Sequence, residues 1–428
     1  MISNLYKYYT ESSGISTDTR NVKPGNIFFA LKGPNFNGNK YASQALEKGA
    51  ILAVIDEEEF LTENCILVTN VLETLQDLAS YHVDQLNIPI IGITGSNGKT
   101  TTKELTFAVL STTFKTFCTQ GNLNNHIGVP LTILSISNDI EIAIIELGAN
   151  HIGEIELLCK IAKPTHGIIT NIGMDHLEGY GSIEGVAKGN SELYYHLLKN
   201  QGWVFVNSED ELLVRMASRL ENRYTYPAEN DHLHLQCANN DLYLQLAVND
   251  ISFTTQLTGK YNLYNIGAAL AIGQFFKVPL NKATEAVANY KPSNMRSQLI
   301  ENGTNRIILD AYNANPSSME VALANLNEIN ASKKIAILGD MFELGNVAET
   351  EHERIASLAN NYNFDSLILI GHDFAQTKLN ANNVLKFETR ELAEVWLKNQ
   401  TFENTTFLLK GSRGMALEKI LTLFEKSN

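Results

Sequence analysis

The chain has 428 residues, of which 44% are hydrophobic and 19% are charged, and its formal net charge is −14. This composition is that of folded domains, and the acidic balance excludes a general nucleic-acid coat protein. Four cysteines without a C-x-x-C pair predict reduced thiols, with neither a disulfide framework nor a zinc site. We see no signal-peptide pattern and no apolar run near the roughly 20 residues of a membrane span, and therefore expect a soluble, cytoplasmic protein.

Short runs rich in Ile and Val, bounded by Gly, Asn or Pro, alternate with helix-like segments along the chain. Such runs are typical of buried strands in parallel sheets, so the sequence predicts an α/β fold. The expected strands are Ile51–Ile55, Ile66–Val68, Ile88–Ile93, Ile142–Leu147, Gly167–Thr170, Arg306–Leu309, Lys334–Leu338, Ser366–Ile370 and Thr406–Lys410.

We expect three domains, at residues 1–86, 87–297 and 298–428. The first boundary lies in "HVDQLNIPI", where a helical stretch gives way to a strand, and the second follows the Pro- and Asn-containing segment "VANYKPSNMRSQ". Between Trp203 and Leu257 apolar and polar residues alternate, which predicts an antiparallel flap inserted in, or added to, the middle domain.

The segment "IIGITGSNGKTTTKEL" (residues 90–105) contains the Gly-Lys-Thr of a phosphate-binding loop. An expected strand precedes it, and a predicted helix, Thr101–Leu110, follows. A glycine-rich turn in this position directs backbone N–H groups and a helix N-terminus at one point, which suits phosphate. Lys99 would reach the outer phosphates, and the Thr100 hydroxyl would hold magnesium.

The spacing of this loop indicates which family the chain resembles. In the pattern G-x-x-x-x-G-K-[ST] the first glycine would stand at Ile93, but the available glycine is Gly95. The shorter motif T-G-x-x-G-K-T-T resembles the loop of the Mur ligases and folylpolyglutamate synthases, which are ATP-dependent amide-forming enzymes. The residues of the motif, expected to bind ATP, are Thr94, Gly95, Ser96, Asn97, Gly98, Lys99, Thr100 and Thr101.

Further blocks resemble this family in the same order. The segments "GNLNNHIGVP", "AIIELGANHIGEI" and "ITNIGMDHLEGYGS" contain Asn124 and Asn125, Glu146, and His176. A lone histidine is more often structural, but Glu146 and His176 both follow expected strands, at the sheet edge where ligands gather. The resemblance implies that Thr100, Glu146 and His176 hold magnesium and that Lys99, Glu146 and His176 are catalytic.

The segment "GKYNLYNIGAALAIG" resembles the family's adenine-contacting block. Asn262 and Asn265 are present, while Tyr261 replaces the usual histidine. The resemblance also implies that Arg296 and Asp310 contact the phosphate and the ribose of ATP.

The first domain resembles the UDP-sugar domain of the family members that extend the muramoyl peptide, and folylpolyglutamate synthases lack this domain. We therefore expect a UDP-muramoyl-substrate-binding domain, a central ATP-binding ligase domain and a C-terminal ligase domain. The residues that carry this resemblance, in "STDTRNVKPGNIFFALKGPNFNGNK", are Asp18, Thr19, Arg20, Lys32, Gly33, Asn37 and Gly38.

Three C-terminal blocks, "LDAYNANPSSM", "AILGDMFELG" and "LLKGSRGMALEKI", resemble one branch of the family. That branch uses ATP and magnesium to join D-alanyl-D-alanine to UDP-N-acetylmuramoyl-tripeptide through an acyl phosphate, giving a peptidoglycan precursor. The resemblance implies these two partners and, with no nucleic acid bound, a monomer. The expected acceptor-side residues are Asn124, Asn125, Tyr312, Asn313, Asn315, Lys410 and Arg413.

One position departs from the family pattern. Fourteen residues after His176 the family usually has a lysine that becomes carbamylated and helps to hold magnesium, whereas this chain has Asn190. Lys188 stands two residues earlier and, on a helix, would not share that face. We expect Asn190 to offer its amide oxygen to the metal, or water to complete the shell.

Three other interpretations stay open at this point. The chain could be the sister ligase that adds the third amino acid, lysine or diaminopimelate, to the peptide. It could be an idle ligase-like subunit that binds nucleotide for a partner, an idea that only Asn190 supports. A P-loop kinase or GTPase would need a separate Walker-B aspartate and would have no UDP-sugar domain.

Overall fold

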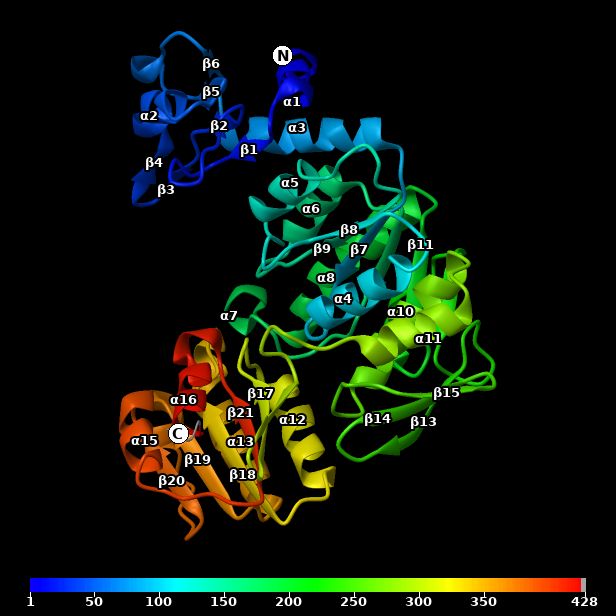
Figure 1. Cartoon of the computed structure of the whole chain (residues 1–428), viewed down its shortest axis with the longest axis vertical. Coiled ribbons are helices and arrows are strands. Elements are labelled where there is room, and N and C mark those ends of the chain that lie inside the picture. The colour runs from blue at the N-terminus through cyan, green and yellow to red at the C-terminus, as the bar shows by residue number, and fades with distance from the viewer. Residues whose placement is uncertain (425–428) are drawn as a thin grey trace.

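The structure is a computed structural model that describes residues 1–424, apart from the side chain of Asn240. Three larger sheets, each with its own helices, follow one another along the long axis of the molecule (Figure 1). The α/β class predicted from the sequence is confirmed, and each of the nine expected strands overlaps an observed one.

The N-terminal sheet is parallel and has the strand order β1-β2-β5-β6. A short antiparallel hairpin, β3–β4, projects from it. The strands are β1 (Ile15–Ser16), β2 (Ile27–Phe29), β3 (Lys32–Gly33), β4 (Phe36–Asn37), β5 (Leu52–Ile55) and β6 (Cys65–Leu67). The helices are α1 (Ile2–Glu11), α2 (Ala42–Glu47) and the 3₁₀ turns η1 (Gly38–Tyr41) and η2 (Glu58–Phe60).

Helix α3 (Val71–Leu86) fastens this sheet to the central domain. It begins at Asn70, whose side chain accepts hydrogen bonds from the first free backbone N–H groups of the helix. Its apolar face, which includes the fully buried Leu75 and Leu78, belongs to a single hydrophobic cluster. The members of this cluster come from both domains and range from Leu5 to Leu220. The N-terminal and central domains therefore share one apolar core.

The central sheet is parallel throughout, with the order β12-β11-β10-β7-β9-β8. Its strands are β7 (Ile90–Thr94), β8 (Thr116–Cys118), β9 (Ile142–Glu146), β10 (His166–Ile169), β11 (Trp203–Asn207) and β12 (Arg223–Tyr226). Helices α4 (Lys99–Leu110), α10 (Asn262–Phe275) and α11 (Leu280–Asn289) cover one face. Helices α5 (Gly128–Ile133), α6 (Glu154–Ala162) and α8 (Ile183–Lys199) cover the other face. Helix α9 (Glu211–Met216) adds the buried Leu213 to it, and α7 (Leu177–Tyr180) is a single short turn before α8.

The predicted flap is wrong in its extent. Only β13 (Leu235–Asn240), β14 (Leu244–Val248) and β15 (Ile251–Thr254) form an antiparallel sheet. Strands β11 and β12 extend the central sheet in parallel instead. Strand β12 is an edge strand with only its last residue buried, so its sequence does not show the continuous apolar run of an inner parallel strand.

The C-terminal sheet has the order β16-β17-β21-β18-β19-β20, and only β16 is antiparallel to its neighbour. Its strands are β16 (Gln298–Asn302), β17 (Asn305–Asp310), β18 (Lys333–Gly339), β19 (Ser366–Ile370), β20 (Val384–Phe387) and β21 (Thr405–Lys410). The helices are α12 (Pro316–Glu328), α13 (Ala348–Asn361), α14 (His372–Gln376), α15 (Arg390–Leu397) and α16 (Leu421–Phe424), with 3₁₀ turns η3 (Gly345–Val347), η4 (Arg413–Met415) and η5 (Leu417–Ile420). The buried residues of its two hydrophobic clusters all lie between residues 307 and 420.

The domain boundaries expected from the sequence stay predictions. Residue 86 is the last residue of α3, and residue 297 directly precedes β16. Within residues 1–424, no helix has both the length and the apolar character needed to cross a membrane.

Because α3 lies in the shared core, truncating one of its buried side chains should destabilise the protein strongly. A Leu78→Ala change removes a fully buried side chain from α3 and should lower the free energy of unfolding by about 2–5 kcal/mol, measured by urea denaturation. Leu61, which is 47% exposed in the same domain, provides the matched control, and Leu61→Ala should change it by less than about 0.5 kcal/mol. Equal effects of the two changes would contradict the shared core.

Candidate active site

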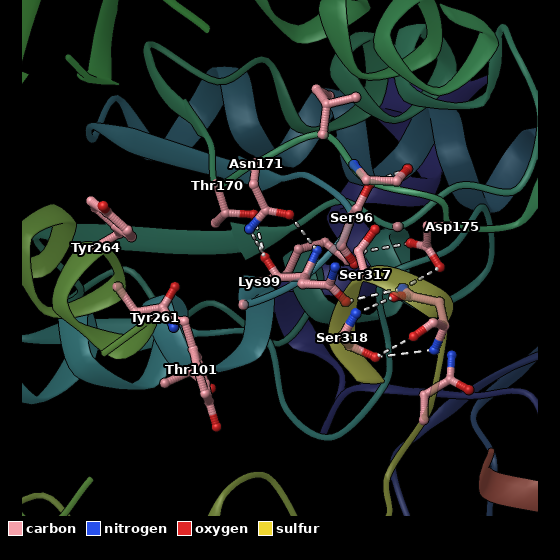
Figure 2. A pocket seen from close by; sticks show the side chains of 18 of the residues that line it. Ser96, Lys99, Thr101, Thr170, Asn171, Asp175, Tyr261, Tyr264, Ser317 and Ser318 are labelled. Atoms are coloured by element: carbon pink, nitrogen blue, oxygen red, sulfur yellow. Dashed lines mark hydrogen bonds and ion pairs between the residues drawn. The ribbon is translucent and has the colours of Figure 1, made fainter. Parts of the chain in front are cut away.

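A cavity of about 1010 Å³ lies between the central and C-terminal domains. Loops after β7, β9 and β10 form one side, and residues after β17, the start of α12 and the end of β21 form the other. Figure 2 shows polar side chains from both sides directed into this space, among them Lys99, Asp175 and Ser317.

The pairing of the central strands explains why the predicted catalytic residues meet. Strand β7 pairs in parallel with β9 on one side and with β10 on the other. The carboxyl ends of all three strands therefore lie at the same edge of the sheet. Lys99, Glu146 and His176, which follow or end these strands, all line the cavity.

The loop before α4 depends on glycines at two positive-φ positions. Gly95 has φ +127° and Gly98 has φ +83°, and a Cβ on Gly98 would lie 2.4 Å from Asn265 Oδ1. The same Asn265 oxygen accepts a hydrogen bond from the Thr102 hydroxyl at 3.1 Å. The loop thus packs directly against α10, and only a residue without a side chain fits at position 98.

Lys99 is directed back onto its own loop. Its ammonium donates to the carbonyl oxygens of Gly95 and Ser96, the second at 3.3 Å, and Asp175 Oδ2 lies 4.0 Å away. A lysine held by neutral carbonyl groups beside a helix N-terminus is available to an anion that enters the loop.

Asn171, which the sequence reasoning missed, ties this loop to the one after β10. The backbone N–H of Asn97 donates to Asn171 Oδ1 at 3.0 Å, and Asn171 Nδ2 donates to the Asn97 carbonyl at 2.9 Å. The Thr170 hydroxyl donates to the same carbonyl at 2.6 Å (Figure 2). The signal was present, because Asn171 lies in the quoted segment "ITNIGMDHLEGYGS".

Glu146 carries the clearest sign of a cation site. It is 2% exposed, and its Oε1 accepts a hydrogen bond from Asn124 Nδ2 at 2.9 Å. Its Oε2 is buried without a hydrogen-bond partner, and the Lys103 ammonium lies 3.7 Å away. The Lys103 ammonium partly compensates the charge of this carboxylate, but Oε2 itself accepts no hydrogen bond, so an oxygen of the type that magnesium prefers is available there.

His176 lies at the start of α7 with a left-handed backbone (φ +48°). Its Nε2 is 3.6 Å from Asp175 Oδ1, and its Nδ1 contacts the carboxylate of Glu343 from the C-terminal domain. Neither acidic residue was assigned a role from the sequence. Asp175 stands next to the expected histidine, and Glu343 lies in the quoted block "AILGDMFELG".

Asn190 is buried on α8, and its amide groups are already used within the fold. Its Oδ1 accepts from the Thr94 hydroxyl at 2.8 Å, and its Nδ2 donates to the Val186 carbonyl at 2.9 Å. The expectation that this oxygen serves a metal is therefore not supported, because it stabilises the end of β7 instead. Lys188 is exposed and lies outside the cavity lining.

The nucleotide-side residues predicted after α10 also meet at the cavity. The guanidinium of Arg296 lies 4.0 Å from the centre of the Tyr312 ring, and its Nε is buried without a hydrogen-bond partner. Asp310 accepts from Lys410 Nζ at 2.6 Å and from the Ser297 backbone at 3.2 Å.

Tyr261, which directly precedes α10, and Tyr264 within it keep the protons of their hydroxyl groups. The Tyr261 hydroxyl pairs with Ser297 Oγ at 2.6 Å, and burial, with a contribution from Asp310, raises the pKa of Tyr261. Burial and the neighbouring Glu209 carboxylate raise the pKa of Tyr264 to about 12. Both hydroxyl groups are therefore neutral at physiological pH.

Not every predicted site residue lies on the cavity. Arg413 pairs with Glu418 at 3.4 Å and does not line it, and neither do Thr94, Gly95 and Thr100. Asn125 does line it, although its side chain also accepts hydrogen bonds from the backbone at the start of α5. The remaining residues predicted for ATP or the acceptor side line the cavity: Ser96, Asn97, Gly98, Thr101, Asn124, Asn262, Asn265, Tyr312, Asn313, Asn315 and Lys410.

The residues predicted to bind the UDP group lie in the N-terminal domain, and none of them lines this cavity. Asp18 and Arg20 form an ion pair, and the hydrogen bonds from Arg20 lower the pKa of Asp18 to about 2. Lys32 pairs with Asp56 at 3.0 Å. Arg20 also lines a second cavity of about 1000 Å³, and the roles of Asp18, Thr19, Arg20, Lys32, Gly33, Asn37 and Gly38 stay predictions.

Asp340, His352 and Asp373 form the one set of three acidic or histidine side chains close enough to share a metal ion within the described part of the chain. His352 Nε2 accepts from the Met341 backbone at 3.0 Å, and its Nδ1 pairs with the Ala348 carbonyl. Both Asp340 oxygens accept backbone hydrogen bonds at the start of α14. The His352 and Asp340 atoms are therefore already hydrogen-bonded, and they connect the end of β18 with α13 and α14.

Three family models match the chain. Residues 11–93 match "Mur ligase family, catalytic domain", residues 93–273 match "Mur ligase middle domain", and residues 295–413 match "Mur ligase, glutamate ligase domain". Together they cover all three sheets.

Full-length relatives agree with these matches. The chain is 34% identical to the UDP-N-acetylmuramoyl-tripeptide–D-alanyl-D-alanine ligase of Bacillus subtilis, over 98% of this chain and 94% of that protein. The protein of the same name from Escherichia coli is 30% identical over 96% of this chain and 94% of that protein. Among solved structures, MurF from Acinetobacter baumannii superposes with a TM-score of 0.88 at 29% identity, covering 100% and 99% of the two chains. MurF from Thermotoga maritima in complex with ADP superposes with a TM-score of 0.87 at 26% sequence identity, covering 98% of each chain.

The close contact at Gly98 predicts the effect of adding a methyl group there. Gly98→Ala should weaken ATP binding at least about tenfold, measured by calorimetry, because the Cβ would displace Asn265 and distort the loop. Gly153→Ala is the matched control, because Gly153 has φ +94° but open space around it, and ATP binding should be unchanged. Unaltered ATP binding in Gly98→Ala would show that the loop does not hold the nucleotide.

Proposed function

The chain belongs to the Mur ligase family, and on this premise we propose that it joins the terminal carboxylate of UDP-N-acetylmuramoyl-tripeptide to the amine of D-alanyl-D-alanine, using ATP. The product is the UDP-muramoyl-pentapeptide of peptidoglycan precursor synthesis. The observation that carries this proposal is the juxtaposition of Lys99, the buried Glu146 carboxylate and His176 in one cavity between two domains.

The chemistry requires activation of the carboxylate, whose oxygen is a poor leaving group. A carboxylate oxygen attacks the γ-phosphorus of ATP, the new O–P bond forms, and ADP leaves with the bridging oxygen. The amine nitrogen then attacks the acyl carbon, the C–N bond forms, the C–O bond to phosphate breaks, and the ammonium loses its proton. Both steps concentrate negative charge, so electrostatic stabilisation of the transition states supplies most of the rate enhancement.

Different residues of this chain bind the phosphates, the magnesium and the ribose. Lys99 leaves the Gly95 and Ser96 carbonyls and binds the outer phosphates together with the backbone N–H groups of the loop. Thr100, Glu146 and His176 would hold magnesium, which supplies positive charge to the nucleotide and the carboxylate. Arg296, stacked on Tyr312, has its Nε free for a phosphate oxygen. Asp310, held by Lys410, accepts from the ribose.

The C-terminal side of the cavity supports the choice of acceptor. Tyr312, Asn313 and Asn315 of the "DAYNANP" block all line the cavity opposite Lys99. Their amide and phenol groups suit a dipeptide, whose polar backbone needs hydrogen-bond partners when it leaves water. Enclosure between two domains also excludes water, which would otherwise hydrolyse the acyl phosphate.

The proposal is tested by phosphate release from ATP with magnesium, omitting one substrate at a time. We expect release only when both UDP-N-acetylmuramoyl-tripeptide and D-alanyl-D-alanine are present, and a pentapeptide product in the mass spectrum. Lysine and diaminopimelate forms of the tripeptide are compared in parallel. Release with a single amino acid as acceptor would instead identify the sister ligase.

A Lys99→Ala change should reduce ATP turnover by at least about 100-fold, because the developing phosphate charge loses its nearest cation. Lys115→Ala is the matched control in the same domain, since Lys115 is exposed and pairs only with Asp139 on the surface. Turnover retained in Lys99→Ala would exclude the role assigned to the loop.

The environment of Asn190 predicts that the enzyme does not need carbon dioxide. A carbamylated lysine requires carbon dioxide, but position 190 carries an amide that pairs with Thr94, and Lys188 is exposed. Turnover in buffer depleted of carbon dioxide should therefore equal turnover with added bicarbonate. Activation by bicarbonate would show that another lysine of the site becomes carbamylated.

A further inference from the structure

The loop at residues 173–178, which carries His176, is held by the C-terminal domain from two directions. The start of α12 contacts its first half, and the loop between β18 and η3 contacts its second half. Figure 1 shows α7, which follows His176, next to the C-terminal domain. The contacts are Met174 N to Ser317 Oγ (3.1 Å), Asn315 Nδ2 to Asp175 Oδ1 (3.3 Å), Glu178 N to Glu343 O (3.2 Å) and His176 Nδ1 to the Glu343 carboxylate.

The partner of Nδ1 determines the tautomer of the His176 ring. An ionised carboxylate only accepts hydrogen bonds, so the Glu343 carboxylate places the proton on Nδ1. In the neutral ring the lone pair is then on Nε2. That nitrogen is 3.6 Å from Asp175 Oδ1, and the ring lines the cavity.

In this tautomer Nε2 and Asp175 Oδ1 are two electron-pair donors 3.6 Å apart. A cation between them would bind both, and imidazole nitrogen with carboxylate oxygen is a common pair of metal ligands. A histidine that binds metal through one ring nitrogen usually donates its other N–H to a carboxylate, which fixes the ring. Glu343 has the position and the chemistry of that carboxylate.

The loop that presents Glu343 is itself fixed within the C-terminal domain. The Met341 backbone donates to His352 Nε2 at 3.0 Å, and the Phe342 backbone donates to Ser412 Oγ at 2.8 Å. The Ser412 backbone donates to the Asp340 carbonyl at 3.1 Å. The backbone that leads to Glu343 is therefore anchored to the C-terminal domain.

From these contacts we propose that Glu343 is a positioning residue for His176. When the C-terminal domain docks, the Glu343 carboxylate fixes the Nδ1–H tautomer and presents Nε2 beside Asp175 to a divalent cation. The cation site is complete only in the docked state, which couples metal binding to enclosure of the substrates. This inference rests on the proposed role of His176 as a magnesium ligand.

The test measures the ring and the metal directly, without substrates. Protein labelled with ¹⁵N-histidine is examined by NMR to determine which His176 nitrogen carries the proton, and binding of Mn²⁺, as a paramagnetic probe, is measured by electron paramagnetic resonance with a non-hydrolysable ATP analogue. The variants are Glu343→Ala, Glu343→Gln and the control Glu349→Ala, an exposed glutamate of the same domain. The His176 signal is identified by its loss in His176→Gln.

We expect the Nδ1–H tautomer in the unchanged protein and in Glu349→Ala. Glu343→Ala should lose that preference and bind Mn²⁺ about 10- to 100-fold more weakly. Glu343→Gln, whose amide oxygen still accepts from Nδ1, should recover the tautomer. An unchanged tautomer and Mn²⁺ affinity in Glu343→Ala, or a ring protonated on both nitrogens with magnesium present, would overturn the proposal. Because no tripeptide or dipeptide is used, this result is independent of the substrate-omission assay, which alone decides the proposed function.

Discussion

The parallel pairing of β7 with both β9 and β10 is the constraint on which the active site depends. It places the phosphate loop, the Glu146 carboxylate and the His176 loop at one sheet edge, although they are far apart in sequence. The hydrogen bonds between Asn97 and Asn171, and between Thr94 and Asn190, then fix the loops relative to one another. The site is therefore organised by backbone pairing first and by side-chain amides second.

Much of this organisation could be predicted from the sequence. Apolar runs predicted most of the inner strands because strands buried on both faces carry few polar residues, although β2 was not expected and β11 was assigned to the flap. The family resemblance implied Lys99, Glu146 and His176, and their places at strand ends supported it because strand ends in a parallel sheet share an edge. The outer strand β12 was wrongly assigned to the antiparallel flap because an edge strand is only partly buried and does not show a continuous apolar run. The contact of Glu343 with His176 could not be predicted, because it depends on how two separately folded domains meet.

Position 190 likewise shows that the sequence does not predict contacts between distant residues. Counting from His176 identified Asn190 as the departure from the family pattern, but its hydrogen bond to Thr94 crosses from a helix to the end of a strand 96 residues away. Sequence spacing describes neighbours on one element and carries no information about such partners. What the substitution does became clear only from the packing of α8 against β7.

The two junctions between domains differ in kind. The N-terminal and central domains share one apolar core around α3, whereas the fully buried residues of the C-terminal clusters all lie at 307 or beyond, and Leu242 and Met295 of the central domain only pack against their edges. The C-terminal domain meets the central loops near the cavity through hydrogen bonds of Asn315, Ser317 and Glu343. Opening the first junction would expose apolar surface to water, while groups at the second can exchange their partners for water at small net cost. Separating the C-terminal domain from the central one would thus disrupt less buried apolar core than separating the N-terminal domain, so opening to admit substrates is expected at the joint that covers the cavity.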